Sequence, residues 1–179
     1  MLKLNNAVLL LVDIQGKLAH MMHEKERLFA NLRKLIKGIQ VLGIPVLWVE
    51  QNPVGLGPTI PEVADLLTDS TPIGKMSFSS CRNDRFLQAL KNLDRNQVLI
   101  AGIEAHICVY QTAVDLVNMG VGVQVVTDAV SSRTAENKAI GLQRMRDAGA
   151  GLTSVETALF ELLEVAEGEA FKALLKIVK

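Results

Sequence analysis

The feature that most constrains the fold of this chain is a regular alternation of two hydrophobic patterns. Short runs that are apolar at nearly every position alternate with longer segments whose apolar residues recur every three or four positions. The short runs are Ala7–Val12, Ile44–Val49, Gln97–Ile103 and Gly122–Thr127. Runs that are rich in Val, Ile and Leu and apolar on both faces are typical of parallel strands covered by helices on either side.

The segments between these runs predict helices. From Glu24 to Leu42 the apolar residues form one stripe and the lysines face away from it, and Gly43 ends the segment. Further helices are expected over Asn83–Leu93, Val109–Met119, Thr134–Ala148 and Glu156–Ala166. Strands and helices in regular succession predict an α/β fold of three layers, in which right-handed crossovers join parallel strands.

Residues 51–76 interrupt this alternation. Prolines and glycines are concentrated there, and we expect a long structured loop, which in a compact domain often carries function. A chain of 179 residues is expected to form one domain over residues 1–179.

Charge and composition exclude several classes of protein. The 19 basic and 19 acidic residues cancel, so we expect no nucleic-acid partner, because phosphate binding needs concentrated positive charge. No apolar run approaches the roughly 20 residues that cross a bilayer, and the N-terminus lacks a signal-peptide pattern, so no membrane association is expected. The two cysteines, Cys81 and Cys108, cannot form a disulfide framework, which favours a cytoplasmic location.

Several polar residues follow the predicted strands, where ligands of open parallel sheets bind. Asp13 follows the first run, Lys75 closes the proline-rich segment, and Cys108 follows the third run after a short turn. We expect these three to converge at one edge of the sheet. Three more polar residues lie near the same strand ends and are expected to line a substrate pocket: Gln15, Gln51 and His106.

Cys108 is the most informative of these residues because it immediately precedes a predicted helix. The positive end of the helix dipole favours the thiolate and should lower the thiol pKa, which would make Cys108 a nucleophile near neutral pH. A small buried hydrophobe is an equally good interpretation from position alone.

Asp13 and Lys75 each have an ordinary alternative. An acid placed directly after six apolar residues needs a partner or a function, but Asp13 could also cap the following helix. A single lysine such as Lys75 is usually solvated surface, and only its convergence with the acid and the thiol favours a role in the site.

Metal and cofactor sites are not expected. His20, His23 and His106 lack the spacing of metal ligands. The segment Gly55-Leu56-Gly57 lacks the third glycine of a dinucleotide loop and does not follow the strand as such a loop should.

Taken in order, these motifs resemble those of the isochorismatase-like cysteine hydrolases, over nearly the whole chain. The resemblance is carried by Asp13-Ile14-Gln15, by Lys75 to Ser79, by Gly102 with Cys108-Val109, and by Asp128-Ala129. The small isochorismatase-domain branch, related to nicotinamidase and N-carbamoylsarcosine amidase, is similar in further segments. These segments are Glu50-Gln51 with Gly55 to Thr59, His106 to Thr112, and Arg144-Met145-Arg146.

The resemblance implies a Rossmann-like αβα fold with a six-stranded parallel sheet and a Cys–Asp–Lys triad. Cys108 would attack an amide carbonyl and form a thioester, Asp13 would take the thiol proton and pass it to the leaving amine, and Lys75 would hold both charges. The family also implies a cis peptide between Ile103 and Glu104, with the N–H groups of Glu104 and Cys108 facing the oxyanion.

Two departures from the family refine this expectation. Nicotinamidases bind a metal through an Asp-x-His arrangement after the second strand, whereas this chain has Glu50-Gln51-Asn52-Pro53, so neither a metal nor nicotinamide is expected. Glu104 is an unusual charge beside the nucleophile, and would select a cationic group or face solvent.

The function expected from the resemblance is cysteine hydrolysis of a small amide or carbamoyl compound. The alternatives are vinyl-ether hydrolysis of the isochorismatase type and a non-catalytic scaffold. We also expect a homo-oligomer, because the Val109–Met119 helix is apolar around most of its circumference and the C-terminus carries a second apolar strip. The interface is expected near residues 51–74 or the helix after Cys108.

Overall fold

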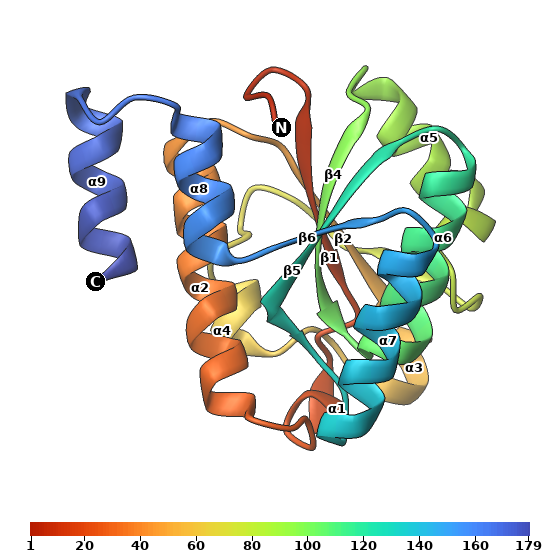
Figure 1. The fold of residues 1–179 in the computed structure, drawn as a ribbon. Helices are drawn as coiled ribbons and strands as arrows, with labels where there is room; N and C mark the ends of the chain where they lie inside the picture. The colour runs from red at the N-terminus through yellow and green to blue at the C-terminus, as the bar shows by residue number, and fades with distance from the viewer.

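The computed structural model describes all 179 residues and is built on one all-parallel sheet of six strands, in the order β3-β2-β1-β4-β5-β6 (Figure 1). The strands are β1 (Ala7–Val12), β2 (Val46–Gln51), β3 (Ile73–Lys75), β4 (Gln97–Ile103), β5 (Gly122–Ser131) and β6 (Gly151–Thr153). The expected α/β class and the six-stranded parallel sheet are confirmed.

Helices cover both faces of the sheet, so that two hydrophobic cores form (Figure 1). Along β1, Leu9 and Leu11 point into one core while Val8 and Leu10 point into the other. The first face is covered by α2 (Lys25–Val41) and α8 (Val155–Leu163), and α9 (Gly168–Val178) packs on the outer side of these two helices. The second face is covered by α5 (Asp84–Asn92), α6 (Tyr110–Asn118) and α7 (Ala135–Asp147).

The C-terminal strip expected at a subunit contact packs in part within the chain, while Phe171, Leu175, Ile177 and Val178 stay half-buried. The strip forms α9, which lies against α2 and α8. Leu174 is completely buried, and the Phe171 ring meets that of Phe160 edge to face at 6.4 Å.

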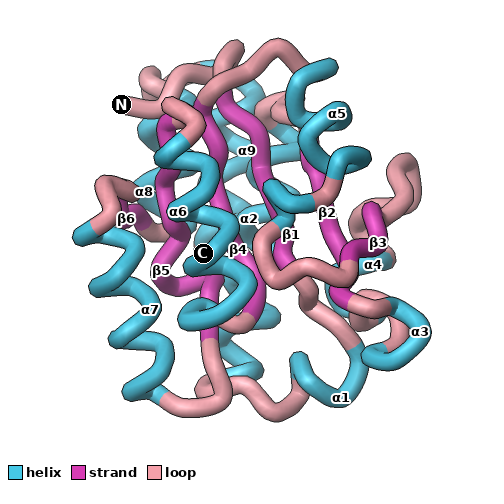
Figure 2. The backbone as a smooth tube through the Cα atoms, turned by 90° about the vertical axis from the view of Figure 1, so that its right-hand side faces the viewer, coloured by secondary structure: helices cyan, strands magenta, loops and turns pink.

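The segment after β2 is more ordered than the expected long loop. It contains two short helices, α3 (Pro53–Leu56) and α4 (Pro61–Ala64), and then the edge strand β3. With α1 (Gly16–Ala19), α3 lies at the end of the molecule where the central strands finish (Figure 2). No helix of the chain combines the length and the apolar character that spanning a membrane requires.

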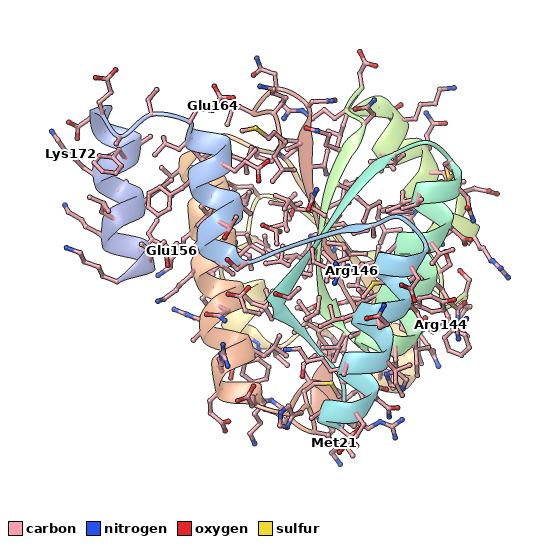
Figure 3. All side chains as sticks on the ribbon, viewed as in Figure 1. Met21, Arg144, Arg146, Glu156, Glu164 and Lys172 are labelled. Carbon is pink, nitrogen blue, oxygen red and sulfur yellow. The ribbon has the colours of Figure 1, made fainter.

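Two helices on the second face are joined through a motif that the sequence singled out. The guanidinium of Arg144 on α7 lies 4.6 Å from the ring centre of Tyr110 on α6, and the neighbouring Met145 is buried in the core of this face. Figure 3 shows Arg144 projecting from α7. This cation–π contact holds α7 against the helix that follows Cys108.

Candidate functional site

The centre of the site is a buried ion pair between two strand ends. Asp13 follows β1 in a left-handed conformation, with φ of 53°, and is only 3% exposed. Lys75 ends β3, and its side chain is inaccessible to solvent. The two residues are separated by β2, yet Lys75 Nζ lies 2.8 Å from Asp13 Oδ2.

Lys75 is held toward Asp13 by oxygen atoms on its other sides. Its ammonium also donates to Gln51 Oε1 at 2.8 Å and to the carbonyls of Ser77 and Phe78 at 3.2 Å each. The solvated-lysine interpretation is therefore wrong. Asp13 is not a helix cap either, because α1 begins after Gln15 without any side-chain cap.

The second oxygen of Asp13 is left free. Asp13 Oδ1 is the one buried side-chain oxygen or nitrogen of the protein without a hydrogen-bond partner. Burial raises the pKa of Asp13, while the charge and hydrogen bond of Lys75 and contact with the Cys108 thiol oppose that rise. A buried carboxylate with one unpaired oxygen is able to accept a proton.

Cys108 lies in a π-helical turn, Ala105–Val109, between β4 and α6, and is 7% exposed. Burial and then the negative charge of Asp13 raise the pKa of the Cys108 thiol to about 12, although Lys75 opposes this. The expectation of a lowered pKa is wrong, because desolvation of the thiolate outweighs the favourable end of the helix. The cysteine rests as a thiol.

The backbone before Cys108 contains a cis peptide and leaves one hydrogen-bond donor free. The Ile103–Glu104 peptide bond is cis, and the N–H of Glu104 donates to no protein acceptor. Gly141 of α7 packs so closely on this turn that a Cβ there would lie 2.6 Å from the Ala105 carbonyl oxygen and 2.8 Å from His106 N. The turn is therefore supported from behind by a neighbouring helix.

The three expected pocket residues have different surroundings. Gln15 is completely buried and joins β1 to the segment after β2, because it donates to the carbonyls of Gln51 and Gly57 and accepts from Gln51 N. The Gln51 side chain bridges Lys75 and the Met76 carbonyl. His106 Nδ1 lies 3.0 Å from Oγ of Ser132, the residue that follows β5.

Glu104 is largely buried and forms an ion pair with Arg133. It is 6% exposed, and its Oε2 accepts from the backbone N of Arg133 at 3.0 Å and from Arg133 Nε at 3.1 Å. Sequence reasoning missed Arg133, because the polar residue Asp128 hides the continuation of β5 to Ser131.

The residues do not fit the metal site of nicotinamidases. No three His, Cys, Asp or Glu side chains are grouped so that they could hold a metal ion. Glu50 lies in the segment where nicotinamidases have their Asp-x-His arrangement. Here it accepts hydrogen bonds from the backbone N and the hydroxyl of Thr59.

A cavity of about 470 Å³ lies beside the ion pair. Its walls include Pro53, Lys75, Met76 and Arg82, but neither Asp13 nor Cys108. Two apolar side chains near it are strongly exposed, Val54 at 98% and Met76 at 73%.

Fold and site together define a three-layer α/β protein that gathers an acid, a lysine and a cysteine at the carboxyl ends of its parallel strands. Residues 7–157 match the model of the isochorismatase domain, and the chain belongs to this family.

Relatives match over almost the full length of the chain. An isochorismatase domain-containing protein 2 of Danio rerio is 35% identical over 178 residues, covering 99% of this chain and 89% of that protein. The structure of the MAR1 ribonuclease of Caenorhabditis elegans superposes with a TM-score of 0.91 at 35% identity, over 99% of this chain and 91% of that one.

Two bacterial structures share the fold at lower identity. The YcaC gene product of Escherichia coli, described as an octameric hydrolase of unknown specificity, has a TM-score of 0.93 at 26% identity, over 98% of this chain and 88% of that one. YcaC of Pseudomonas aeruginosa, described with covalent acrylamide, has a TM-score of 0.92 at 25% identity, over 98% and 90%.

Proposed function

We propose that this protein is a cysteine hydrolase of small amide or carbamoyl compounds and acts through a thioester. The observation that carries the proposal is the pairing of a solvent-free Lys75 with Asp13 Oδ2, which leaves Asp13 Oδ1 without a partner, while Asp13 and the Cys108 thiol act on each other's pKa. A buried ion pair is weak evidence for stability alone, because hydrophobic residues of similar volume often do as well. A chemical role accounts for it better.

The high pKa of Cys108 makes a base necessary. As Sγ attacks the carbonyl carbon, Asp13 Oδ1 accepts the thiol proton, a carbon–sulfur bond forms, and the carbonyl electron pair moves to oxygen. The N–H groups of Glu104 and Cys108 meet that oxygen. The intermediate then collapses, the carbon–nitrogen bond breaks, and Asp13 passes its proton to the leaving amine.

Hydrolysis of the thioester reverses these roles. Water attacks the thioester carbon while Asp13 takes a proton from it, the carbon–sulfur bond breaks, and the proton returns to Sγ. Lys75 keeps its proton throughout. It stabilises the Asp13 carboxylate whenever that group has given its proton away.

The relatives support this chemistry. The Escherichia coli protein is described as a hydrolase, and the Pseudomonas aeruginosa protein carries covalent acrylamide, an electrophile that reacts with nucleophiles. One relative favours a second candidate, because the Caenorhabditis elegans protein is named a ribonuclease. Vinyl-ether hydrolysis and a non-catalytic scaffold remain the alternatives within the fold.

A panel assay separates these candidates. Small amides and carbamoyl compounds are screened for ammonia release, alongside isochorismate and a single-stranded RNA, with the parent protein and Cys108→Ser. We expect ammonia release by the parent only, together with an acyl adduct on Cys108 in the intact mass. Cleavage of isochorismate or RNA alone, or equal ammonia release by Cys108→Ser, would refute the thioester mechanism.

We also propose that the chain works as one domain over residues 1–179 in the cytoplasm, and as a homo-oligomer. The octameric Escherichia coli relative supports assembly, as do the exposed apolar side chains of Val54 and Met76. Light scattering at micromolar concentration tests it, and a mass near 19.5 kDa would contradict it.

A further inference from the structure

The two carbonyl groups that bind Lys75 belong to the loop between β3 and α5. Lys75 Nζ donates to the carbonyl oxygens of Ser77 and Phe78 at 3.2 Å each. The loop is closed at its base, because Asn83 Nδ2 donates to the Gly74 carbonyl at 3.2 Å. Two of the four oxygen acceptors of the ammonium therefore depend on how this loop is held.

Helix α6 holds the loop through two side chains. Ser79 Oγ donates to Asp115 Oδ2 at 2.6 Å, and the backbone N of Ser80 donates to Thr112 Oγ1 at 2.9 Å. Ser79, Ser80 and Thr112 are inaccessible to solvent, whereas the Asp115 side chain is 30% exposed. Two successive residues of the loop are thus each bound by one residue of α6.

The contact between Ser79 and Asp115 is placed next to the carbonyls that bind Lys75. Ser79 directly follows Phe78, and Ser77 Oγ donates to the Ser79 carbonyl at 2.9 Å, so the loop is folded back on itself here. A short hydrogen bond from a hydroxyl to a carboxylate is about twice as strong as one between neutral groups. The bond to Asp115 is therefore the strongest of the side-chain contacts that hold the loop on α6.

The helix that holds the loop is also the one that follows the thiol. The turn that contains Cys108 runs directly into α6. Thr112 comes one helical turn after the cysteine, and Asp115 about two turns after it. A shift of the loop relative to α6 would therefore change the position of Lys75 relative to Cys108.

The charge of Asp115 acts on the other thiol of the chain. Burial and then this charge raise the pKa of Cys81 to about 12. The charge of Lys75, in contrast, is the one that lowers the pKa of Cys108. The two thiols can therefore report separately on the charge of Asp115 and on its hydrogen bond.

We propose that Asp115 is a positioning residue that acts through Ser79 on the Lys75 ammonium. It holds the loop whose two carbonyl groups bind Lys75, and so keeps this ammonium against Asp13. The proposal rests on the proposed amidase mechanism and adds to it a residue outside the triad.

The test measures iodoacetamide labelling at Cys108 and at Cys81 in the same sample, by peptide mass spectrometry at pH 7. Asp115→Ala removes both the charge and the hydrogen-bond acceptor. Asp115→Asn removes the charge but keeps an oxygen that can accept from Ser79. Ser79→Ala removes the donor of the same hydrogen bond.

In Asp115→Ala we expect labelling of Cys108 to slow about tenfold, because a displaced Lys75 no longer lowers the Cys108 pKa to the same extent. Labelling of Cys81 should become faster in the same variant, because the negative charge beside it is gone. Asp115→Asn should also speed labelling of Cys81, but should leave Cys108 within about twofold of the parent. A general loosening of the fold would instead speed the labelling of both thiols.

The double variant Ser79→Ala/Asp115→Ala tests whether the two residues act through one contact. Ser79→Ala alone should slow Cys108 labelling about as much as Asp115→Ala. The double variant should be no slower than either single variant, because all three lose the same hydrogen bond. Independent effects would multiply to about 100-fold.

Asp147→Ala is the matched control, because Asp147 is an exposed aspartate of α7 that also accepts one side-chain hydrogen bond, from Gln143. It should leave both thiols at the parental rate. Thermal unfolding checks that each variant folds, and if Asp115→Ala does not, Ser79→Ala and Asp115→Asn carry the comparison. Parental labelling of Cys108 in folded Asp115→Ala or Ser79→Ala, equal slowing in Asp115→Asn, or multiplying effects in the double variant would overturn the proposal.

Ammonia release from the panel of amides and carbamoyl compounds separates this proposal from the amidase function. The expected labelling pattern without ammonia release by the parent would retain the positioning role of Asp115 and remove the amidase function. Ammonia release by the parent, with parental labelling of Cys108 in every folded variant of Asp115 and Ser79, would do the reverse.

Discussion

Replacing Lys75 by Met is the sharpest test of the buried ion pair. Met fills the volume of the lysine stem but removes the ammonium, so Asp13 loses its partner at 2.8 Å while it stays 3% exposed. The Gln51 side-chain oxygen and the carbonyls of Ser77 and Phe78 lose the same donor.

The magnitude follows from what remains buried. Removing one partner of a buried pair typically costs about 3–5 kcal/mol in the free energy of unfolding. An opposite charge at this distance commonly lowers a carboxyl pKa by about 1–3 units, and each unit corresponds to about 1.4 kcal/mol. The variant should therefore be several kcal/mol less stable than the parent at neutral pH.

The loss should depend on pH in a defined direction. Burial already raises the pKa of folded Asp13 above its unfolded value, and Lys75 opposes that rise. A raised carboxyl pKa means that the folded state holds a proton that the unfolded state has released, so stability falls as pH rises through the interval between the two pKa values. Removing Lys75 widens this interval. The difference in unfolding free energy between variant and parent should therefore be smaller at pH 4 than at pH 8.

Urea unfolding at one protein concentration measures the unfolding free energy at each pH. The fluorescence of Trp48 is the signal, since Trp48 is the single tryptophan and is 7% exposed in β2. The double variant Asp13→Asn/Lys75→Met has no charge at either of these two positions. Its loss of unfolding free energy should be smaller than the sum of the two single losses by about 2 kcal/mol or more. Lys37→Met, at an exposed site on α2, should change stability by less than about 0.5 kcal/mol. A loss that is equal at pH 4 and pH 8, or that is additive in the double variant, would refute the reasoning.

Four further predictions concern activity. Cys108→Ala and Cys108→Ser should abolish hydrolysis and keep the thermal unfolding temperature, and an active alanine variant would exclude a covalent mechanism. Asp13→Asn should lower turnover by about 10²–10⁴ and slow iodoacetamide labelling at pH 7, whereas labelling at the parental rate would show that Asp13 is not the base. Activity should survive EDTA, and a loss on chelation that zinc or manganese restores would contradict this. Gly141→Ala should displace the turn at Ala105 and lower turnover by roughly 10- to 100-fold, while Gly122→Ala, with only ordinary contacts, should not, and equal effects would reject this role of the turn.

The long elements could be predicted because they carry strong patterns. β1 has six consecutive apolar residues, and α2 has one continuous stripe. The strand β3 could not be predicted, because Ile73-Gly74-Lys75 contains a single large apolar residue. The strand β6 is equally short and could not be predicted for the same reason.

The candidate site could be predicted only in part. Proximity to strand ends brought Asp13 and Cys108 to attention, but no spacing rule predicts the contact of Lys75 with a residue 62 positions away. The pKa of Cys108 depends on burial, which position before a helix does not reveal. Arg133 was missed because its ion pair with Glu104 joins the ends of two strands that are far apart in the sequence.

The order of the strands has a consequence for the newly made chain. Asp13 follows the first strand to be synthesised, Lys75 ends the third and Cys108 follows the fourth, although the sheet places β1 between β2 and β4. Until these strands have paired, the nascent chain carries only an ordinary, unassisted thiol. On the proposed mechanism, rapid reaction of Cys108 with a substrate would therefore mark chains that have completed the sheet.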